Sequence, residues 1–298
     1  MIRVSKFNSN VRRFFSTGSN QNHADYCANL VKKFDYENYL VALFSPQRDS
    51  IFAIRAFNIE TATIQDVVTD TNIGKMRLEW WKSVIENTFD GRPVEHPVSI
   101  QLAKALESNR LSKTWFIKML RERESHLSQS QFPTIEKLEQ FSENTASSLL
   151  YLQLEALGIT DSKLDHAIGH LGKAIGISLT LRGLPHNINK RVFTLPSEVM
   201  SKYSISTEEV FRKGPNLEEF KDVVFEIATR ANDQLLTARS FHADIPKAAL
   251  PVFLHGVPCQ HYLSRLEASD FNLFDKPLFN RSLTLPFQIW KNARNGVF

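Results

Sequence analysis

The chain has 298 residues, of which 42% are hydrophobic and 23% charged, a composition typical of a globular protein. Its formal net charge is +4, but Arg3, Lys6, Arg12 and Arg13 all lie within the first 22 residues, which contain no acid. Without these cations, basic and acidic residues are equal in number, so the rest of the chain is neutral. A nucleic-acid-binding protein would carry positive charge on its folded body, and the balance therefore argues against that class.

Cysteine positions and hydropathy argue against two further classes, zinc-binding proteins and transmembrane proteins. Cys27 and Cys259 lie far apart and outside any zinc-ligand spacing, which favours a reduced compartment and no structural zinc. No stretch approaches the roughly 18 uninterrupted apolar residues of a transmembrane helix, so none is expected.

The N-terminal segment has the composition of a mitochondrial transit peptide. It is basic, rich in serine and asparagine and free of acids, and it lacks the apolar core of a secretory signal. Arg13-Phe14-Phe15-Ser16 is similar to a processing site with arginine three residues before the new N-terminus. We therefore expect a transit peptide over residues 1–15 and a folded domain over residues 16–298. A disordered basic tail is the alternative.

From His23 onward the apolar periodicity predicts helices, and no segment alternates convincingly like a strand. Pro46 and the Asp90–Pro93 segment are expected to end helices, whereas Pro97 begins one in its first turn. No internal repeat or flexible linker divides the chain, which predicts one all-α domain. The expected helices cover residues 29–44, 50–70, 74–89, 97–107, 112–127, 133–157, 162–181, 207–213, 217–241 and 246–257.

Three details of this helical pattern make specific expectations. Gly169, Gly172 and Gly176 lie within a helical pattern, where they would permit close helix packing. The final segment, residues 278–298, mixes aromatic residues with cations, which suits the interface of an anionic bilayer. A last helix docked on the core is its alternative. The helix over 74–89 is expected to bury one face, formed by Met76, Trp80, Val84 and Ile85.

Several motifs resemble the squalene/phytoene synthase family. Ser50–Asn58 is similar to the apolar helical run that precedes the family's first aspartate-rich motif. Arg77–Lys82, Asp90–Pro93 and His96–Val98 are similar to its K-L-x-W-W, G-x-P and H-P-V elements, which are scaffold features. The resemblance implies the family's all-α fold. It also implies a reaction of two prenyl diphosphates in which aspartates hold Mg²⁺, a cation that prefers carboxylate oxygens.

The first aspartate-rich motif is degenerate in this chain. Counting on from the apolar run, its five positions fall on residues 62–66, where only Asp66 is an acid. Asp66 and Asp70 form a D-x-x-x-D pair whose spacing of four would place both on one helix face, where they could share a metal. The alternative, which we favour, is a solvated helix end.

The second aspartate-rich motif has lost its acids completely. Its carboxylate positions fall on Gly183, His186 and Asn187, and Pro185 is expected to interrupt the helix at this point. Arg182 stands where the family has arginine, and we interpret it as a structural cation covering the helix end, with anion binding as the alternative. Lys190 and Arg191, together with His186, could recognise a phosphate. A solvated basic loop is the simpler interpretation.

The chain is also similar to a non-enzymatic branch of this family, through Arg55–Glu60, Glu143–Leu152, His170–Ile177 and Ala238–His242. This resemblance implies an inactive protein with no catalytic, cofactor-binding or metal-binding residues and no cofactor. It further implies a mitochondrial matrix protein, peripheral to the inner membrane, that acts early on a mitochondrially encoded subunit and on assembly intermediates of respiratory complex I. The alternatives are a Mg²⁺-dependent prenyl or terpenoid transferase using Asp66 and Asp70, and a prenyl-lipid-binding protein.

Overall fold

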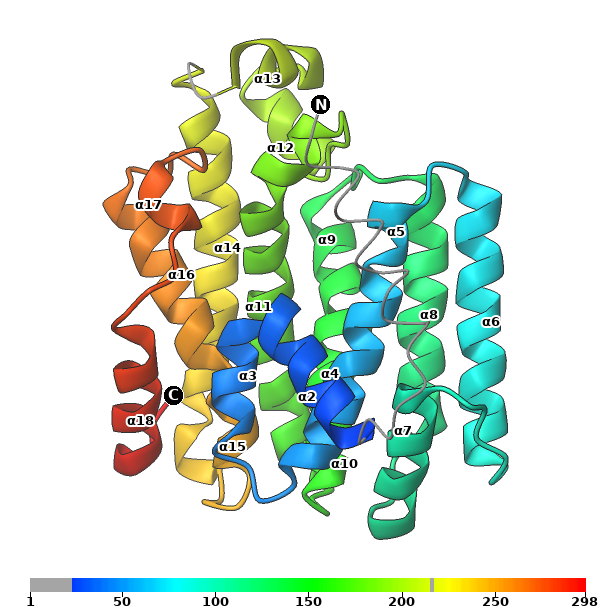
Figure 1. Cartoon of the computed structure of the whole chain (residues 1–298). Coiled ribbons are helices and arrows are strands. Elements are labelled where there is room, and N and C mark those ends of the chain that lie inside the picture. The colour runs from blue at the N-terminus through cyan, green and yellow to red at the C-terminus, as the bar shows by residue number, and fades with distance from the viewer. Residues whose placement is uncertain (1–22, 215–216) are drawn as a thin grey trace.

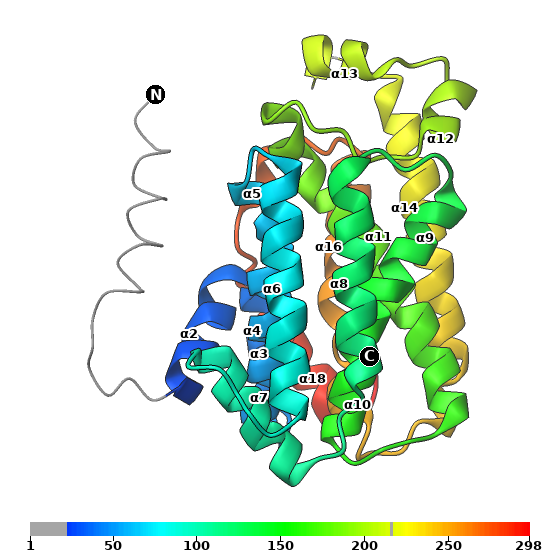
Figure 2. The ribbon, with the colours of Figure 1, turned by 90° about the vertical axis from the view of Figure 1, so that its right-hand side faces the viewer.

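The computed structural model describes residues 23–214 and 217–298, and these residues form helices with no β-strand. The long helices pack side by side as one bundle (Figures 1 and 2). The predicted all-α fold is therefore confirmed. Within the described residues, no helix combines the length and the hydropathy that crossing a membrane requires. The predicted leader, residues 1–15, and the predicted new N-terminus at Ser16 lie outside the described residues.

The helices of the first half follow the expected order with three added breaks, one of which divides the helix expected over residues 50–70 into α4 and α5. Asp35, whose φ of −139° is not helical, separates the first two helices where one was expected. A π-helical turn, η1, interrupts the helix expected over residues 133–157. The elements are α2 (His23–Phe34), α3 (Tyr36–Ala42), α4 (Arg48–Ala62), α5 (Ile64–Val67), α6 (Thr71–Phe89), α7 (Pro97–Ser108), α8 (Lys113–Ser128), α9 (Ile135–Ser142), η1 (Glu143–Ser147) and α10 (Ser148–Ala156).

The second half is built on two long helices, α11 and α14, which lie against each other in the bundle (Figure 1). The expected helix over 246–257 is instead a short α15 followed by α16, which extends eleven residues further along the chain. The elements are α11 (Ser162–Asn189), α12 (Ser197–Lys202), α13 (Thr207–Lys213), α14 (Phe220–Ser240), η3 (His242–Asp244), α15 (Leu250–Phe253), α16 (Gly256–Ala268), α17 (Lys276–Phe279) and α18 (Leu285–Asn295).

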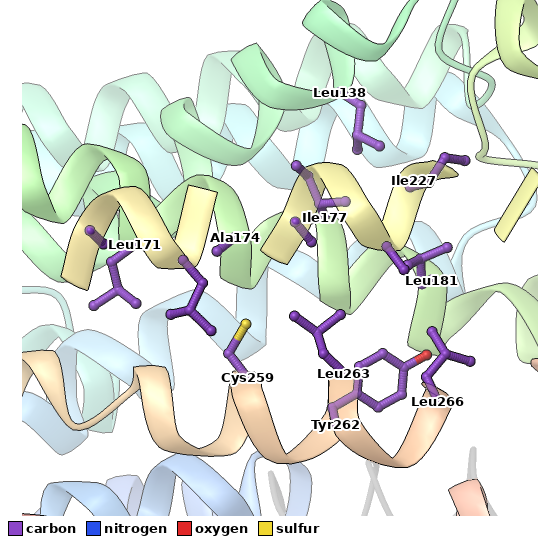
Figure 3. Packing of buried hydrophobic residues seen from close by; sticks show 14 of the residues in the cluster. Leu138, Leu171, Ala174, Ile177, Leu181, Ile227, Cys259, Tyr262, Leu263 and Leu266 are labelled. Carbon is purple, nitrogen blue, oxygen red and sulfur yellow. The ribbon is translucent and has the colours of Figure 1, made fainter. Parts of the chain in front are cut away.

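Two clusters of buried side chains form the core. The first lies among α2, α4, α6, α7, α8 and α10, where Phe57 packs edge-on against Trp81 and Phe116. The second surrounds α11, whose Ile177 and Leu181 lie between α14 and α16 (Figure 3). Every residue from Ser50 to Phe57 is buried, so this part of α4 is enclosed on all sides, which explains why it is apolar apart from Ser50 and Arg55.

Helix α11 approaches η1 and the end of α9 so closely that only glycine fits. A Cβ atom on Gly172 would lie 2.1 Å from Ser147 Oγ, and one on Gly176 would lie 2.4 Å from Ser142 Cβ. Both serines are completely buried, and Ser147 Oγ donates a hydrogen bond to the Gly169 carbonyl oxygen at 3.1 Å. The expectation that these glycines permit close helix packing is confirmed at Gly172 and Gly176.

The buried face of α6 is not the predicted one. Met76 and Trp80 are exposed, Trp80 by 49%, whereas Leu78 and Trp81 are buried together with Val84 and Ile85. A row at strict spacing of four advances about 40° around the helix at each step, because a turn has about 3.6 residues. Met76 and Val84 therefore cannot share a narrow face. Contacts with α7 and α8 determine which side chains of α6 are buried.

We predict that Trp81→Ala destabilises the protein far more than Trp80→Ala. Trp81 is 4% exposed and packs edge-on against Phe57 and His96, with ring centroids 5.5 and 5.1 Å away. Its truncation would leave a cavity costing about 3–5 kcal/mol. Trp80 is half exposed, and its loss should cost about 1 kcal/mol. Chemical denaturation of both variants measures the difference, and equal losses would contradict the assignment of the buried face.

Candidate functional site

The region that we expect to correspond to the first aspartate-rich motif, residues 62–66, lies where α4 ends and the short α5 follows. The hydroxyl groups of Thr61 and Thr63 donate to the carbonyl oxygens of Phe57 and Ile59, at 2.8 and 2.9 Å. Hydrogen bonds of this kind compete with the helical pattern and tend to bend a helix. The chain then leaves helical conformation at Val68. The single helix expected over residues 50–70 is therefore broken into α4 and α5.

This break separates the two remaining aspartates of the region. Asp66 lies in α5, whereas Asp70 is the N-cap of α6 and accepts a hydrogen bond from the Asn72 amide at 2.7 Å. The prediction that a spacing of four places both carboxylates on one helix face is wrong, because extended Val68 lies between them. Asp70 serves as a helix cap, a role for which aspartate is well suited.

The region that we expect to correspond to the second aspartate-rich motif lies in the last two turns of α11, which continues through Pro185 to Asn189. The expectation that Pro185 interrupts the helix is wrong. A proline inside a helix costs about 3 kcal/mol through one lost hydrogen bond and a steric clash. Leu181, Leu184 and Pro185 are all buried in the core, and this burial holds the helix together across the proline.

The two motifs face each other, and an ion pair joins them. Lys190 Nζ, at the C-terminal end of α11, lies 2.8 Å from Asp66 Oδ1, and His186 Nε2 lies 3.9 Å from the same oxygen. Both side chains of the Asp66–Lys190 pair are partly exposed, so it contributes at most about 1 kcal/mol to stability. The one carboxylate left from the first motif is therefore neutralised by a cation that the protein itself supplies.

The geometry around this pair does not suit a magnesium ion. Mg²⁺ requires a near-octahedral set of oxygen ligands, several of them commonly carboxylate or phosphate oxygens. Gly183 and Asn187 offer no carboxylate on α11, and the Lys190 ammonium group lies against the one carboxylate nearby, that of Asp66. In the part of the chain that the structure describes, no group of three or more His, Cys, Asp or Glu side chains converges to hold a metal.

The other candidate cations are also engaged by acids. Arg182 Nη2 donates to Glu37 Oε1 at 3.1 Å and thereby ties α11 to α3. It lies well before the end of α11, so it does not cover that end as we expected. Arg191 Nη2 lies 3.8 Å from Glu208 Oε1 and its guanidinium rests against Phe211. We considered His186, Lys190 and Arg191 as a phosphate-binding loop. Each of these side chains lies near a carboxylate of the protein, which would compete with a phosphate for it.

Arg123 is a cation that the sequence analysis did not single out. It projects from α8 toward the end of α4, donating to Asn58 Oδ1 at 2.6 Å and to the Thr61 hydroxyl. Burial lowers the pKa of Arg123 to about 10. Among the described residues no carboxylate lies within ion-pair distance of it. Arg123 therefore holds the end of α4 against α8 through neutral acceptors, in the turn just before the first motif.

A second feature missed from the sequence is a buried polar network around Arg55. Arg55 Nη1 lies 2.7 Å from Asp35 Oδ2, and its Nη2 lies 3.0 Å from His255 Nε2. The His255 ring also contacts Asn38 Oδ1 and Gln153 Oε1, each at 2.8 Å. Burial and the neighbouring guanidinium hold the pKa of His255 well below its ordinary value, so the imidazole is neutral at pH 7.

The available signal for this network was a lone arginine inside an apolar run. Arg55 is the only charged residue between Ser50 and Asn58, and a cation on a fully enclosed helix must find a partner. Neither Asp35 nor His255 is near it in the sequence, and periodicity does not identify partners at such separations. The network links helices and offers no group poised for chemistry on a substrate.

Comparison with known proteins agrees with these motifs. The squalene/phytoene synthase family model matches residues 31–287. The Bos taurus protein named NADH dehydrogenase (ubiquinone) complex I, assembly factor 6 is 41% identical over 267 residues, covering 89% of this chain and 80% of that protein. The Homo sapiens protein of the same name is 39% identical, with the same coverage.

The fold agrees as well. The crystal structure of a dehydrosqualene synthase in complex with ligand matches with a TM-score of 0.80, covering 92% of this chain and 95% of that one. Its sequence identity is 17%, so this likeness concerns the fold alone. Together with the scaffold motifs in α4, α6 and α7, these matches confirm the family resemblance. The chain belongs to the squalene/phytoene synthase family, within the group of relatives that bear the name complex I assembly factor 6.

Proposed function

We propose that this chain is an assembly factor for mitochondrial respiratory complex I. The observation that carries the proposal is identity of 39–41% to the Bos taurus and Homo sapiens proteins of that name, along 89% of this chain. Synthases share the fold at far lower identity, so fold alone would not separate the two functions. Within this role we propose action at an early step, on assembly intermediates that contain a mitochondrially encoded subunit.

We further propose that the protein acts by binding and does not catalyse prenyl transfer. Ionising a prenyl diphosphate requires divalent cations to neutralise the leaving diphosphate, and these need carboxylates on both facing helices. Here α11 contributes Gly183, His186 and Asn187 at those positions, and Asp66 is paired with Lys190. These substitutions support an inactive relative and weigh against the transferase alternative.

A test in cells that lack the protein separates folding from function. We expect Asp66→Asn/Asp70→Asn to restore assembled complex I to the wild-type level, because asparagine retains the α6 cap and no metal is needed. Trp81→Ala should lower protein abundance and complex I together. Native gel electrophoresis and NADH oxidation measure assembly, and Trp80→Ala is the matched control.

The aspartate variant can also contradict the proposal. If it keeps the wild-type melting temperature and abundance but abolishes assembly, the carboxylates act directly in the function. If wild-type protein itself fails to restore complex I, the assembly role is wrong.

A binding experiment addresses the metal site independently of assembly. We predict that calorimetry with Mg²⁺ and a prenyl diphosphate analogue detects no Mg²⁺-dependent tight binding. The physical reason is the Asp66–Lys190 pair together with the missing carboxylates on α11. Micromolar affinity that requires Mg²⁺ and disappears in Asp66→Asn would favour the transferase alternative.

The proposed location is the mitochondrial matrix, with the protein peripheral to the inner membrane. The acid-free basic composition of residues 1–15 supports import, and the Arg13–Ser16 sequence supports one cleavage position. We predict that mass spectrometry of the endogenous protein finds Ser16 as the N-terminus. A retained Met1 would contradict import by this route.

A further inference from the structure

The C-terminal segment exposes an apolar face that the core does not need. Helix α18 docks on α16 and α3 through Leu285 and Ile289, which are buried. On its other side Phe287 is 62% and Trp290 46% exposed, and Leu283, just before the helix, is 93% exposed. Phe287 and Trp290 are three residues apart within α18, so they lie along one face of the helix, and Leu283 precedes it in the chain. Phe287 and Trp290 stack with their ring centroids 5.7 Å apart.

The charge of this segment is uniform. Residues 276–298 contain Lys276, Arg281, Lys291 and Arg294 and no acid, although the chain beyond residue 22 is close to neutral. None of these cations forms an ion pair with a described residue. Arg294 instead lies 5.6 Å from the Trp290 ring centroid, so cation and aromatic ring belong to one surface. An apolar stripe beside unpaired cations is complementary to a surface that is apolar and negatively charged.

A groove adjoins this face and shares Phe287 and Lys291 with it. It lies between α16 and α18, has a volume of 550 Å³, and is lined by Arg239, His261, Phe287 and Lys291 among side-chain amides and hydroxyls. No carboxylate lines it. Arg239 already donates to the Phe298 carbonyl oxygen and to Gln260 Oε1, each at 2.7 Å, so Lys291 is the cation that the groove offers a ligand. A phosphodiester headgroup matches Lys291 beside neutral donors, because charged donors bind phosphate oxygens strongly.

We propose that this C-terminal face, comprising Leu283, Phe287, Trp290, Lys291 and Arg294, docks on a bilayer of anionic phospholipid. The aromatic side chains would enter the boundary between headgroups and acyl chains, where tryptophan is favoured. Lys291 and Arg294 would face the phosphates, with the adjoining groove able to take one headgroup. This inference names the surface behind the membrane association proposed above, and it can fail while the complex I role stands.

The test uses protein purified from its own cells, so that it carries its natural N-terminus. Flotation compares vesicles of phosphatidylcholine with vesicles of phosphatidylcholine and phosphatidylglycerol. We expect binding to the anionic vesicles, at least about twentyfold weaker in Lys291→Glu/Arg294→Glu, since each cation near such a surface contributes roughly fivefold. Phe287→Ser/Trp290→Ser should abolish the binding.

Matched controls come from exposed positions elsewhere. Leu236→Ser, on α14, and Lys104→Glu/Arg110→Glu, around the end of α7, should bind as the wild type does. Lys291→Glu/Arg294→Glu should keep the wild-type melting temperature, because both side chains are exposed. Phe287→Ser/Trp290→Ser should lower it by only a few degrees, because both rings are about half exposed. In vesicles that contain brominated lipid, Trp290→Phe should keep binding but lose quenching of tryptophan fluorescence.

Three results would overturn the proposal. One is equal binding of the wild type to neutral and anionic vesicles. Another is wild-type binding by the α18 variants, which would assign this face to a protein partner if those variants also fail in complex I assembly. The last is unchanged quenching in Trp290→Phe.

Discussion

The buried Arg55–Asp35 ion pair, with His255 beside it, is the interaction on which the arrangement of the helices depends. The residues that flank Arg55 on α4 belong to the first core cluster, and those that flank His255 belong to the second, so the network joins both. Asp35 lies at the break between α2 and α3, so the interruption that ends one helix also places the carboxylate. Leaving one member of a buried pair without its partner costs about 3–5 kcal/mol. Displacing α4, or the break between α2 and α3, would therefore leave the buried Arg55 guanidinium without its carboxylate partner.

The facing ends of α5 and α11 show how charge can be rearranged while a fold is kept. A site with carboxylates on both helices repels itself until divalent cations arrive. In this chain Asp66 on α5 faces Lys190 at the end of α11, so the two ends attract each other. Arg182 and Glu37 repeat the pattern between α11 and α3. These exposed pairs add only a weak attraction to the packing of the core, and no ligand is required to offset repulsion between the helices.

Local patterns predicted local structure well. The helix over Thr207–Lys213 has the predicted bounds, because the Ser206 capping box is encoded within four residues. Pro185 was misjudged because the burial that carries α11 through it comes from other helices. The burial of Trp81 in place of Trp80 could not be predicted for the same reason, because contacts with other helices decide it. The Asp66–Lys190 contact joins residues 124 positions apart, beyond the reach of any periodicity. The sequence therefore shows that Gly183, His186 and Asn187 carry no carboxylate, but it does not show that Lys190 lies against Asp66.

The close contact between α11 and η1 has a consequence for how the molecule can vary and move. Gly172, Gly176, Ser142 and Ser147 meet with almost no side-chain volume between two backbones. Side chains this short have few rotamers, so ordering them costs little conformational entropy, and none can repack to absorb a larger neighbour. If α11 slid along η1 or rotated about its own axis, its side chains would collide with the backbone of η1 and of the end of α9. The contact therefore fixes the position of α11 relative to η1. It thereby also fixes the position of Lys190, which lies 14 residues beyond Gly176 on the same helix.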